Sequence, residues 1–317
     1  MNKINKLYTR REVLALGAGL AAGTLPGISA AQTAKPLLSR AIPKSKEMLP
    51  VIGLGTAIIF DIDGDAEKRA ERTQVIRTLL DGGARLIDTA PSYGTAEPVV
   101  GDLLAAMKVR DQVFLATKVR ANNNEAFVAQ MKASQQRLHS PKIDLMQMHN
   151  VGFLDRNMVA SQLAIVREWK QQGYFRYIGV THSQDQERAN ERLIEMMQQD
   201  KLDFIQVNYS MAERSVESRL LAVAADTGTA LLCNLPFGRA RLFRAVRGKT
   251  VPDWAAEFDA TTWGQFFLKY LLANPAVNAV IPGTDKVEYM IDNLNAGRGR
   301  LPDAAMRKRM VAFIEGL

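Results

Sequence analysis

The stretch AERTQVIRTLLDGGARLIDTAPSYG, residues 70–94, contains a complete helix-to-strand unit. Apolar side chains recur at helical spacing between residues 70 and 80, and the pair Gly82-Gly83 suits the carboxyl end of a helix. The short apolar run at 84–88 then ends on Asp88, and Tyr93 stands in the turn that follows. The stretch predicts a helix, a buried strand that ends on a carboxylate, and a loop that carries a phenol.

The same alternation of strand and helix continues along the chain from residue 50. Short apolar runs, which are candidate strands, occur at 51–57, 84–88, 113–118, 143–149, 175–181, 203–208, 229–234 and 277–281. Eight strands that alternate with helical stretches predict parallel βα units closed into a (β/α)8 barrel, a single domain over residues 32–317. A doubly wound open sheet is the alternative. It would carry a glycine-rich turn after its first strand, where only Gly53 and Gly55 stand.

Composition narrows the class of protein. The chain has 317 residues, 47% of them hydrophobic, which suits a globular protein with a sizeable core. Its net charge of +8 is not gathered into blocks, so no nucleic-acid partner is predicted. Cys233 is the single cysteine and there are three histidines, so we expect neither an internal disulfide nor a metal cluster. A redox role would therefore need a bound organic cofactor.

The first 31 residues have the layout of an export signal. A basic start with Arg10-Arg11 is followed by a short run of small and apolar residues and then by Ser29-Ala30-Ala31. The paired arginines resemble those of a twin-arginine signal, which a translocase reads as an address. We therefore expect residues 1–31 to be removed, with cleavage within about residues 29–34. The twin-arginine translocase is the expected partner, the location is periplasmic or exported, and no stable membrane anchor is predicted.

Four polar side chains follow consecutive predicted strands. Asp88 ends the second strand, Tyr93 lies in its loop, Lys118 ends the third strand and His149 ends the fourth. A barrel places these strand ends side by side at one mouth. There, an ammonium group held by a carboxylate would favour the phenolate form and make the phenol a usable general acid. A neutral imidazole would donate a hydrogen bond to the same substrate oxygen, so the set suits reduction of a carbonyl group.

The motifs around these residues resemble those of the aldo-keto reductase family. They are LPVIGLGT (49–56), LIDTAPSYG (86–94), VFLATKV (113–119), DLMQMHN (144–150), YIGVT (177–181), FIQVNYS (204–210) and VIPGT (280–284), followed by Asn293. The resemblance implies a (β/α)8 barrel that reduces aldehydes or ketones with a nicotinamide cofactor, usually NADPH, bound without a Rossmann fingerprint. It also implies that Asp88, Tyr93, Lys118 and His149 form the catalytic tetrad, with Tyr93 as the acid.

The resemblance further implies a cofactor site at the barrel mouth. Its residues are Gly55, Thr56, Thr181, His182, Gln206, Asn234, Leu235, Phe237, Gly238, Gly283, Thr284, Lys286, Tyr289 and Asn293.

Several of these positions depart from the family pattern. Thr181-His182 replaces Ser-Asn, and Asn234-Leu235 replaces the aromatic ring that stacks on the nicotinamide. Gly283 and Tyr289 replace the cations that bind the 2′-phosphate, so NADH is a second expected cofactor beside NADPH. Ala57 stands where many members carry a tryptophan that lines the substrate pocket, so the resemblance does not identify the substrate.

Two other classes of protein fit part of this pattern. A Schiff-base aldolase also places a lysine at a barrel strand end, and Lys118 would then be its nucleophile, with a lowered pKa. A redox-sensing protein would keep the cofactor and the tetrad but turn over negligibly. Carbonyl reduction is the function that we expect, and these two remain alternatives.

Overall fold

The computed structural model describes residues 35–183 and 186–317, and the predicted export signal at 1–31 lies outside these ranges. The helices are α1 (Ala66–Asp81), α2 (Ala96–Met107), α3 (Asn124–Arg137), α4 (Arg156–Gln171), α5 (Gln186–Asp200), α6 (Leu220–Asp226), α7 (Arg241–Ala245), α8 (Trp263–Leu272), α9 (Val287–Ala296) and α10 (Ala304–Glu315). The strands are β1 (Ser39–Ala41), β2 (Met48–Pro50), β3 (Gly53–Gly55), β4 (Leu86–Asp88), β5 (Phe114–Val119), β6 (Ile143–Met148), β7 (Phe175–His182), β8 (Phe204–Asn208), β9 (Ala230–Asn234) and β10 (Val277–Val280). Short 3₁₀ turns lie at η1 (Arg110–Gln112), η2 (Val151–Phe153), η3 (Ser215–Glu217) and η4 (Asp253–Phe258).

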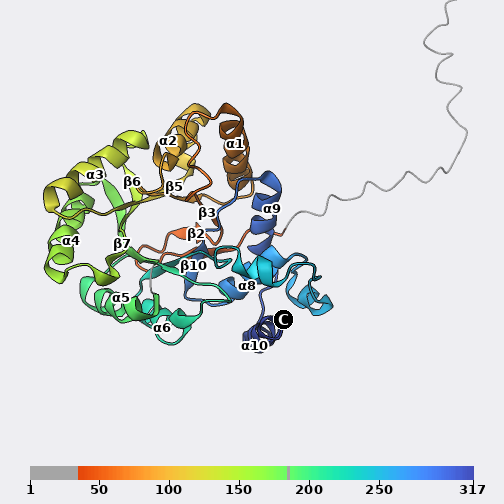
Figure 1. Cartoon of the computed structure of the whole chain (residues 1–317). Coiled ribbons are helices and arrows are strands. Elements are labelled where there is room, and N and C mark those ends of the chain that lie inside the picture. The colour runs from red at the N-terminus through yellow and green to blue at the C-terminus, as the bar shows by residue number, and fades with distance from the viewer. Residues whose placement is uncertain (1–34, 184–185) are drawn as a thin grey trace, which may run out of the picture. The chain divides into compact units, whose positions relative to one another are not determined.

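Strands β3 to β10 form one eight-stranded sheet in sequence order, and every neighbouring pair is parallel. Parallel bridges between Ile52 and Val280 and between Gly55 and Gly283 join the first strand to the last, so the sheet curls into a barrel (Figure 1). Each predicted apolar run overlaps one of these strands, and only β5 and β7 extend beyond their runs, by one residue each. The predicted (β/α)8 barrel is confirmed, and the doubly wound alternative is excluded.

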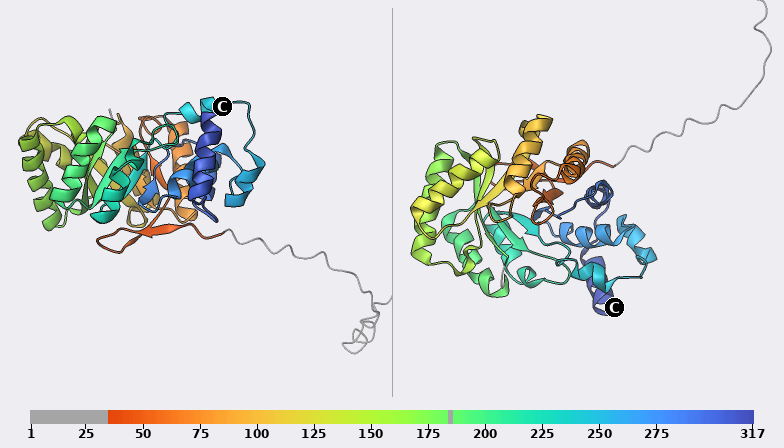
Figure 2. Two further views of the ribbon diagram at one scale, coloured as in Figure 1. Left: turned by 90° about the horizontal axis from the view of Figure 1, so that it is seen from below. Right: turned by 45° about the horizontal axis from the view of Figure 1, so that its top comes forward.

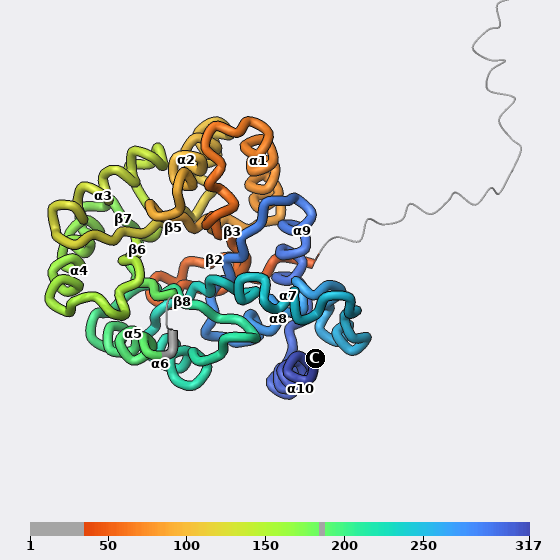
Figure 3. Tube along the Cα trace, in the orientation of Figure 1, coloured from red at the N-terminus to blue at the C-terminus, as the bar shows by residue number. Residues whose placement is uncertain are grey.

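The helices lie around the outside of the barrel, as the tube in Figure 3 shows for α1 to α6. Helix α1 ends where the glycine pair predicts: Gly82 N–H donates to Thr78 O, and Gly83 turns the chain with φ +88°. Within residues 35–183 and 186–317, no helix has both the length and the apolar content that a membrane span requires.

A hairpin that the sequence did not predict covers one end of the barrel. Strands β1 and β2 pair antiparallel, and Figure 2 shows this segment lying along one end of the molecule. Ile42 and Leu49 are fully buried against inward-facing side chains at the start of the barrel strands, among them Leu86, Phe114 and Leu145. The hairpin thus closes the amino-terminal end of the barrel and keeps water from its lower apolar layer.

The side chains on the inner face of the barrel change from apolar to polar along the strands. Because strand side chains alternate, Leu86 and Asp88 of β4 share one face, and so do Leu145 and Gln147 of β6. Apolar side chains form the lower layer of the interior, and polar side chains two residues further along form the layer above it. The polar layer therefore lies at the carboxyl ends of the strands, where barrel chemistry is found.

Candidate active site

The centre of the candidate site is a buried ion pair between neighbouring strands. The side chains of Asp88 and Lys118 are 3% and 1% exposed, and Lys118 Nζ lies 2.5 Å from Asp88 Oδ2. Nζ also donates to Thr89 O at 2.9 Å. Burial alone would lower the pKa of Lys118, but the charge of Asp88 and the interaction with Tyr93 outweigh it and raise this pKa. Lys118 therefore stays a cation at physiological pH.

Tyr93 lies in the turn between β4 and α2, beside this cation. Lys118 Nζ is 4.8 Å from the centroid of the Tyr93 ring. Asp61 ties the turn down, because its Oδ1 accepts from Thr95 N at 2.8 Å and from Thr95 Oγ1 at 2.9 Å. Between Tyr93 and Thr95, Gly94 has φ +59°, and a Cβ at that position would lie 2.2 Å from Asp61 Oδ1. Only glycine fits this close approach.

His149 follows β6 and faces Tyr93 across the mouth. The two ring centroids are 6.1 Å apart, with an edge-to-face angle of 85°. Burial, together with the positive charges of Lys118 and Arg120, lowers the pKa of His149 from 6.5 to about 3. The imidazole is thus neutral at physiological pH and can donate one hydrogen bond. The structure brings the four residues of the predicted tetrad together at one end of the barrel.

Two glutamine amides complete the surroundings of Asp88. Gln147 Nε2 and Gln206 Nε2 donate to Asp88 Oδ1 at 3.0 and 2.8 Å, and Gln206 Nε2 also lies 3.3 Å from Gln147 Oε1. Gln206 is one of the predicted cofactor residues. In the structure its amide nitrogen is hydrogen-bonded to the Asp88 carboxylate. Sequence reasoning missed Gln147. The alternation Leu145, Gln147, His149 in a buried strand is the signal that would have found it.

Thr181 and His182 end β7 and pair in register with Gln206 and its neighbour in β8. Thr181 Oγ1 accepts from Asn150 N at 3.1 Å, so its hydroxyl proton is available for another acceptor. His182 Nδ1 accepts from Gly152 N at 3.1 Å, which leaves Nε2 as the protonated nitrogen when the ring is neutral. Both predicted cofactor residues therefore present donor groups, the chemistry that an amide side chain would otherwise supply.

The ends of β8 and β9 hold buried polar atoms that the described residues leave unpaired. Asn208 Oδ1, Ser210 Oγ and Asn234 Oδ1 are shielded from solvent, and none has a hydrogen-bond partner within the described ranges. Buried polar atoms are nearly always paired, so a cluster of three at a barrel mouth fits a polar ligand. Asn208 and Ser210 were not predicted, although Asn208 follows Gln206 by two residues on the same strand face.

The loop after β9 leaves the barrel through left-handed backbone. Leu235 has φ +48° and Gly238 has φ +56°. Glycine adopts this conformation freely, whereas it strains Leu235, and such strain is common at functional sites. The Phe237 ring packs against Phe243 of α7, with centroids 4.8 Å apart.

Gly55 and Thr56 lie where the barrel seam meets the tetrad. A Cβ on Gly55 would lie 2.8 Å from Ile281 O, so the seam requires a residue without a side chain here. Thr56 Oγ1 donates to Asp88 O at 3.0 Å. Arg72 of α1 binds both loops beside this seam, since it donates to Ile59 O at 2.8 Å and to Asp285 O at 2.9 Å.

The remaining predicted cofactor residues lie at the start of α9 and on it. Thr284 and Asn293 are buried, whereas Gly283, Lys286 and Tyr289 are exposed. Lys286 Nζ lies 5.6 Å from the centroid of the Tyr289 ring. Lys286 is the one lysine or arginine in the segment from Gly283 to Asn293.

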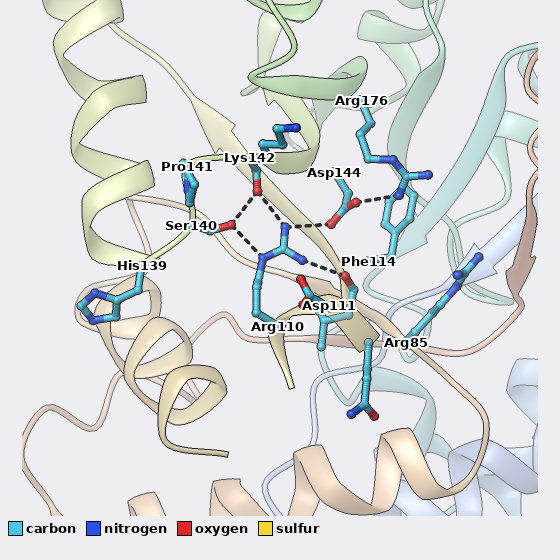
Figure 4. Close-up of a pocket in the computed structure, with 12 residues that line it drawn as sticks. Arg85, Arg110, Asp111, Phe114, His139, Ser140, Pro141, Lys142, Asp144 and Arg176 are labelled. Atoms are coloured by element: carbon cyan, nitrogen blue, oxygen red, sulfur yellow. Dashed lines mark hydrogen bonds and ion pairs between the residues drawn. The ribbon is translucent and has the colours of Figure 1, made fainter. Parts of the chain in front are cut away.

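A cavity of about 340 Å³ lies at the opposite end of the barrel, and Figure 4 shows it lined by several cationic side chains. The Arg110 guanidinium makes four hydrogen bonds there: it donates to Ser140 Oγ and to the backbone oxygens of Val113 and Lys142 at 2.8 to 2.9 Å, and to Asp144 at 3.0 Å. Arg176 binds Asp144 at 2.7 Å and also Glu47 of the hairpin segment. The Arg176–Glu47 ion pair connects the hairpin segment to the barrel.

Among the described residues, no group of histidine, cysteine and carboxylate side chains is arranged to hold a metal ion.

Comparison with known proteins agrees with this geometry. The model of the Aldo/keto reductase family matches residues 51–310. Aldo-keto reductase YhdN of Bacillus subtilis is 32% identical over 188 residues, 55% of this chain and 54% of that protein. The NADH-specific methylglyoxal reductase of Escherichia coli is 28% identical, over 64% of this chain and 68% of that protein. The crystal structure of an aldo-keto reductase from Klebsiella pneumoniae in complex with NADPH superposes with a TM-score of 0.71 at 22% identity, covering 88% and 95% of the two chains.

Proposed function

Because the chain belongs to the aldo/keto reductase family, we propose that this NAD(P)H-dependent oxidoreductase reduces an aldehyde or ketone with Tyr93 as its general acid. The observation that carries this assignment is the buried cluster in which Lys118 Nζ lies 2.5 Å from Asp88 and 4.8 Å from the Tyr93 ring centroid. The cluster lies at the carboxyl ends of the strands, the end of a barrel that carries catalysis.

Each residue of the cluster has a distinct role. Tyr93 donates its phenolic proton to the carbonyl oxygen as negative charge develops there. The Lys118 cation stabilises the phenolate that remains, and Asp88 holds this cation in place. The neutral His149 donates a hydrogen bond that orients the carbonyl. When bound, the reduced nicotinamide supplies the hydride that the carbonyl carbon accepts.

The residues at the mouth fit such a cofactor. The unpaired oxygens of Asn208, Ser210 and Asn234 offer acceptors and donors for its polar groups. Thr181 and His182 offer donors at the end of β7. These five residues, together with Gln206 and the loop residues Gly55, Thr56, Leu235, Phe237 and Gly238, would hold the nicotinamide half.

The segment from Gly283 to Asn293 would hold the adenosine half, and it sets the choice between NADPH and NADH. NADPH is the cofactor that the sequence resemblance implies; the structurally similar reductase from Klebsiella pneumoniae was solved with NADPH, and one relative is named as NADH-specific. Gly283 and Tyr289 carry no charge, so Lys286 alone among the proposed contacts would neutralise a 2′-phosphate. We infer that discrimination between the two dinucleotides is weak.

The aldolase alternative fits the cluster less well. A Schiff-base lysine must lose its proton to act as a nucleophile, so its pKa should be lowered. The pKa of Lys118 is instead raised, because the Asp88 charge outweighs the effect of burial. Borohydride trapping with a carbonyl substrate tests the alternative directly, and a stable adduct on Lys118 would support the aldolase.

Titration of the purified protein with NADPH and NADH, followed by a panel of aldehydes and ketones, tests the proposal. Tyr93→Phe should lower kcat by at least ~100-fold and leave the dinucleotide Kd within about threefold. Near-normal turnover in Tyr93→Phe would refute the assignment of the acid. Single-turnover oxidation of bound reduced cofactor distinguishes a slow reductase from a redox sensor, which would keep its cofactor reduced in the presence of carbonyls.

We also propose that the protein is exported with its dinucleotide bound. Twin-arginine signals of the kind that residues 1–31 resemble carry folded cargo, and a ligand that binds only the native state favours folding before export. Arg10→Lys combined with Arg11→Lys should leave unprocessed protein in the cytoplasm. Protein released from the periplasm should contain dinucleotide. If it is empty yet active once cofactor is added, carriage is refuted while the reductase assignment stands.

A further inference from the structure

Gln147 lies at the centre of the site and has no role in the mechanism described so far. Its side chain is fully buried on the inner face of β6, two residues before His149. Gln147 Nε2 donates to Asp88 Oδ1 at 3.0 Å, and its Oε1 accepts from Gln206 Nε2 at 3.3 Å. Gln206 Nε2 also donates to the same Asp88 oxygen at 2.8 Å. Three side chains thus close a ring of hydrogen bonds, which we call the amide ring.

In the amide ring, the two carboxylate oxygens of Asp88 have different hydrogen-bond partners. Oδ1 accepts from both amides, whereas Oδ2 lies 2.5 Å from Lys118 Nζ. The terminal torsion of an aspartate is broad, so without further contacts the carboxylate could rotate away from the lysine. Two amide donors on one oxygen restrict this rotation, and the other oxygen stays directed at the cation.

The amide ring also determines which way the Gln206 amide faces. The Gln147 carbonyl oxygen can only accept a hydrogen bond, so the group of Gln206 beside it must be the NH₂. The Gln206 carbonyl oxygen is then the atom left for a further donor. An acceptor at this place suits the NH₂ of a carboxamide, the group that a nicotinamide would present.

We propose that Gln147 is a positioning residue for carbonyl reduction, a role that rests on the proposed function: it orients Asp88 toward Lys118 and fixes the amide of Gln206. Gln147 acts through these neighbours. Loss of its hydrogen bonds should therefore change the proton-donating step more than the affinity for the dinucleotide.

The test compares Gln147→Leu with Gln162→Leu. Gln162 of α4 is a second buried glutamine, 1% exposed, whose Nε2 donates to Ala121 O at 2.9 Å. Both substitutions remove a buried amide and should lower the melting temperature by similar amounts. We expect kcat to fall about tenfold only in Gln147→Leu, because a hydrogen bond to a charged group is lost. The dinucleotide Kd should stay within about threefold in both.

The pH profile separates positioning from a general loss of structure. If Asp88 holds Lys118 less firmly, the pKa of Lys118 falls, so the alkaline decline of kcat should move to lower pH in Gln147→Leu and not in Gln162→Leu. In a Lys118→Met background, Gln147→Leu should lower kcat by less than about twofold further, since both changes affect the same step.

The positioning role would be overturned by wild-type kcat and pH profile in Gln147→Leu, or by the same changes in Gln162→Leu. A crystal structure of Gln147→Leu with Asp88 and Gln206 in their original orientations would overturn it even in an inactive protein. A wild-type protein that neither binds dinucleotide nor reduces carbonyls would refute the proposed function instead, and the crystal structure would still decide what Gln147 orients.

Discussion

His149→Gln should change how the stability of the protein depends on pH. In the native protein, burial lowers the pKa of His149 to about 3, so the ring stays neutral far below its ordinary value of 6.5. The unfolded chain protonates this histidine near pH 6.5, as a free imidazole does. Between pH 6.5 and about 3 the unfolded state therefore binds one more proton than the native state. The free energy of unfolding consequently decreases as the pH is lowered through this range.

The size of this effect follows from the linkage relation. Each pH unit in this window costs ~1.4 kcal/mol of unfolding free energy, and pH 5 lies ~1.5 units below the unfolded pKa. His149 should thus account for about 2 kcal/mol of the stability that is lost between pH 7 and pH 5. Glutamine has no proton to bind, so His149→Gln should lose about 2 kcal/mol less over this interval than the wild type does.

Urea unfolding at pH 7 and pH 5, followed by circular dichroism, measures this difference. His139 provides a matched control, because its side chain is 52% exposed and its Nε2 lies 2.8 Å from Asp102 Oδ1 at the surface. We expect His139→Gln to stay within ~0.5 kcal/mol of the wild-type pH dependence. If His149→Gln loses as much stability as the wild type between the two pH values, the imidazole is not held neutral, and its assignment as a neutral hydrogen-bond donor fails.

Three further predictions concern the proton donor and the dinucleotide. Lys118→Met should lower kcat by at least ~100-fold and alter the pH dependence of the remaining activity, and an unaltered pH profile would argue against its role beside the phenol. Gly94→Ala should lower the free energy of unfolding by ~1–2 kcal/mol and also lower kcat, because φ is positive at this residue and the added methyl group contacts Asp61. If Asp61→Ala in the same chain restores neither stability nor kcat, the contact with Asp61 is not the cause. Fluorescence titration should show less than ~10-fold preference for NADPH over NADH, and Lys286→Ala should raise the NADPH Kd by up to about fivefold. A strong NADPH preference that survives this substitution would mean that another group binds the phosphate.

The barrel was predictable because each strand carries its own signal. The runs at 113–118 and 203–208, for example, are apolar, bounded by polar stretches and separated by helical patterns, and β5 and β8 lie within one residue of them. The β1–β2 hairpin was missed because its strands have three residues each and lack a tight turn signature. Its burial depends on contacts with the barrel end that no local pattern encodes.

The proximity of the four predicted catalytic residues was predictable from position, since each lies at the end of a strand or follows one. The structure also shows hydrogen-bond partners of these residues that are distant in the sequence. Gln206 bonds to Asp88 although 118 positions separate them in the sequence. Asp61 holds the Tyr93 turn from another loop, and its role depends on a backbone N–H of Thr95. Contacts of this kind arise only when the barrel closes, so strand patterns do not reveal them.

The seam between β3 and β10 has a consequence for synthesis and quality control. It joins Ile52 to Val280, so the barrel cannot close until Val280 has left the ribosome. Until then both outer strands are open edges that can pair with other chains. Nascent or truncated chains that end before residue 277 would expose these edges and should depend on chaperones, whereas the completed chain removes both edges in one closing step.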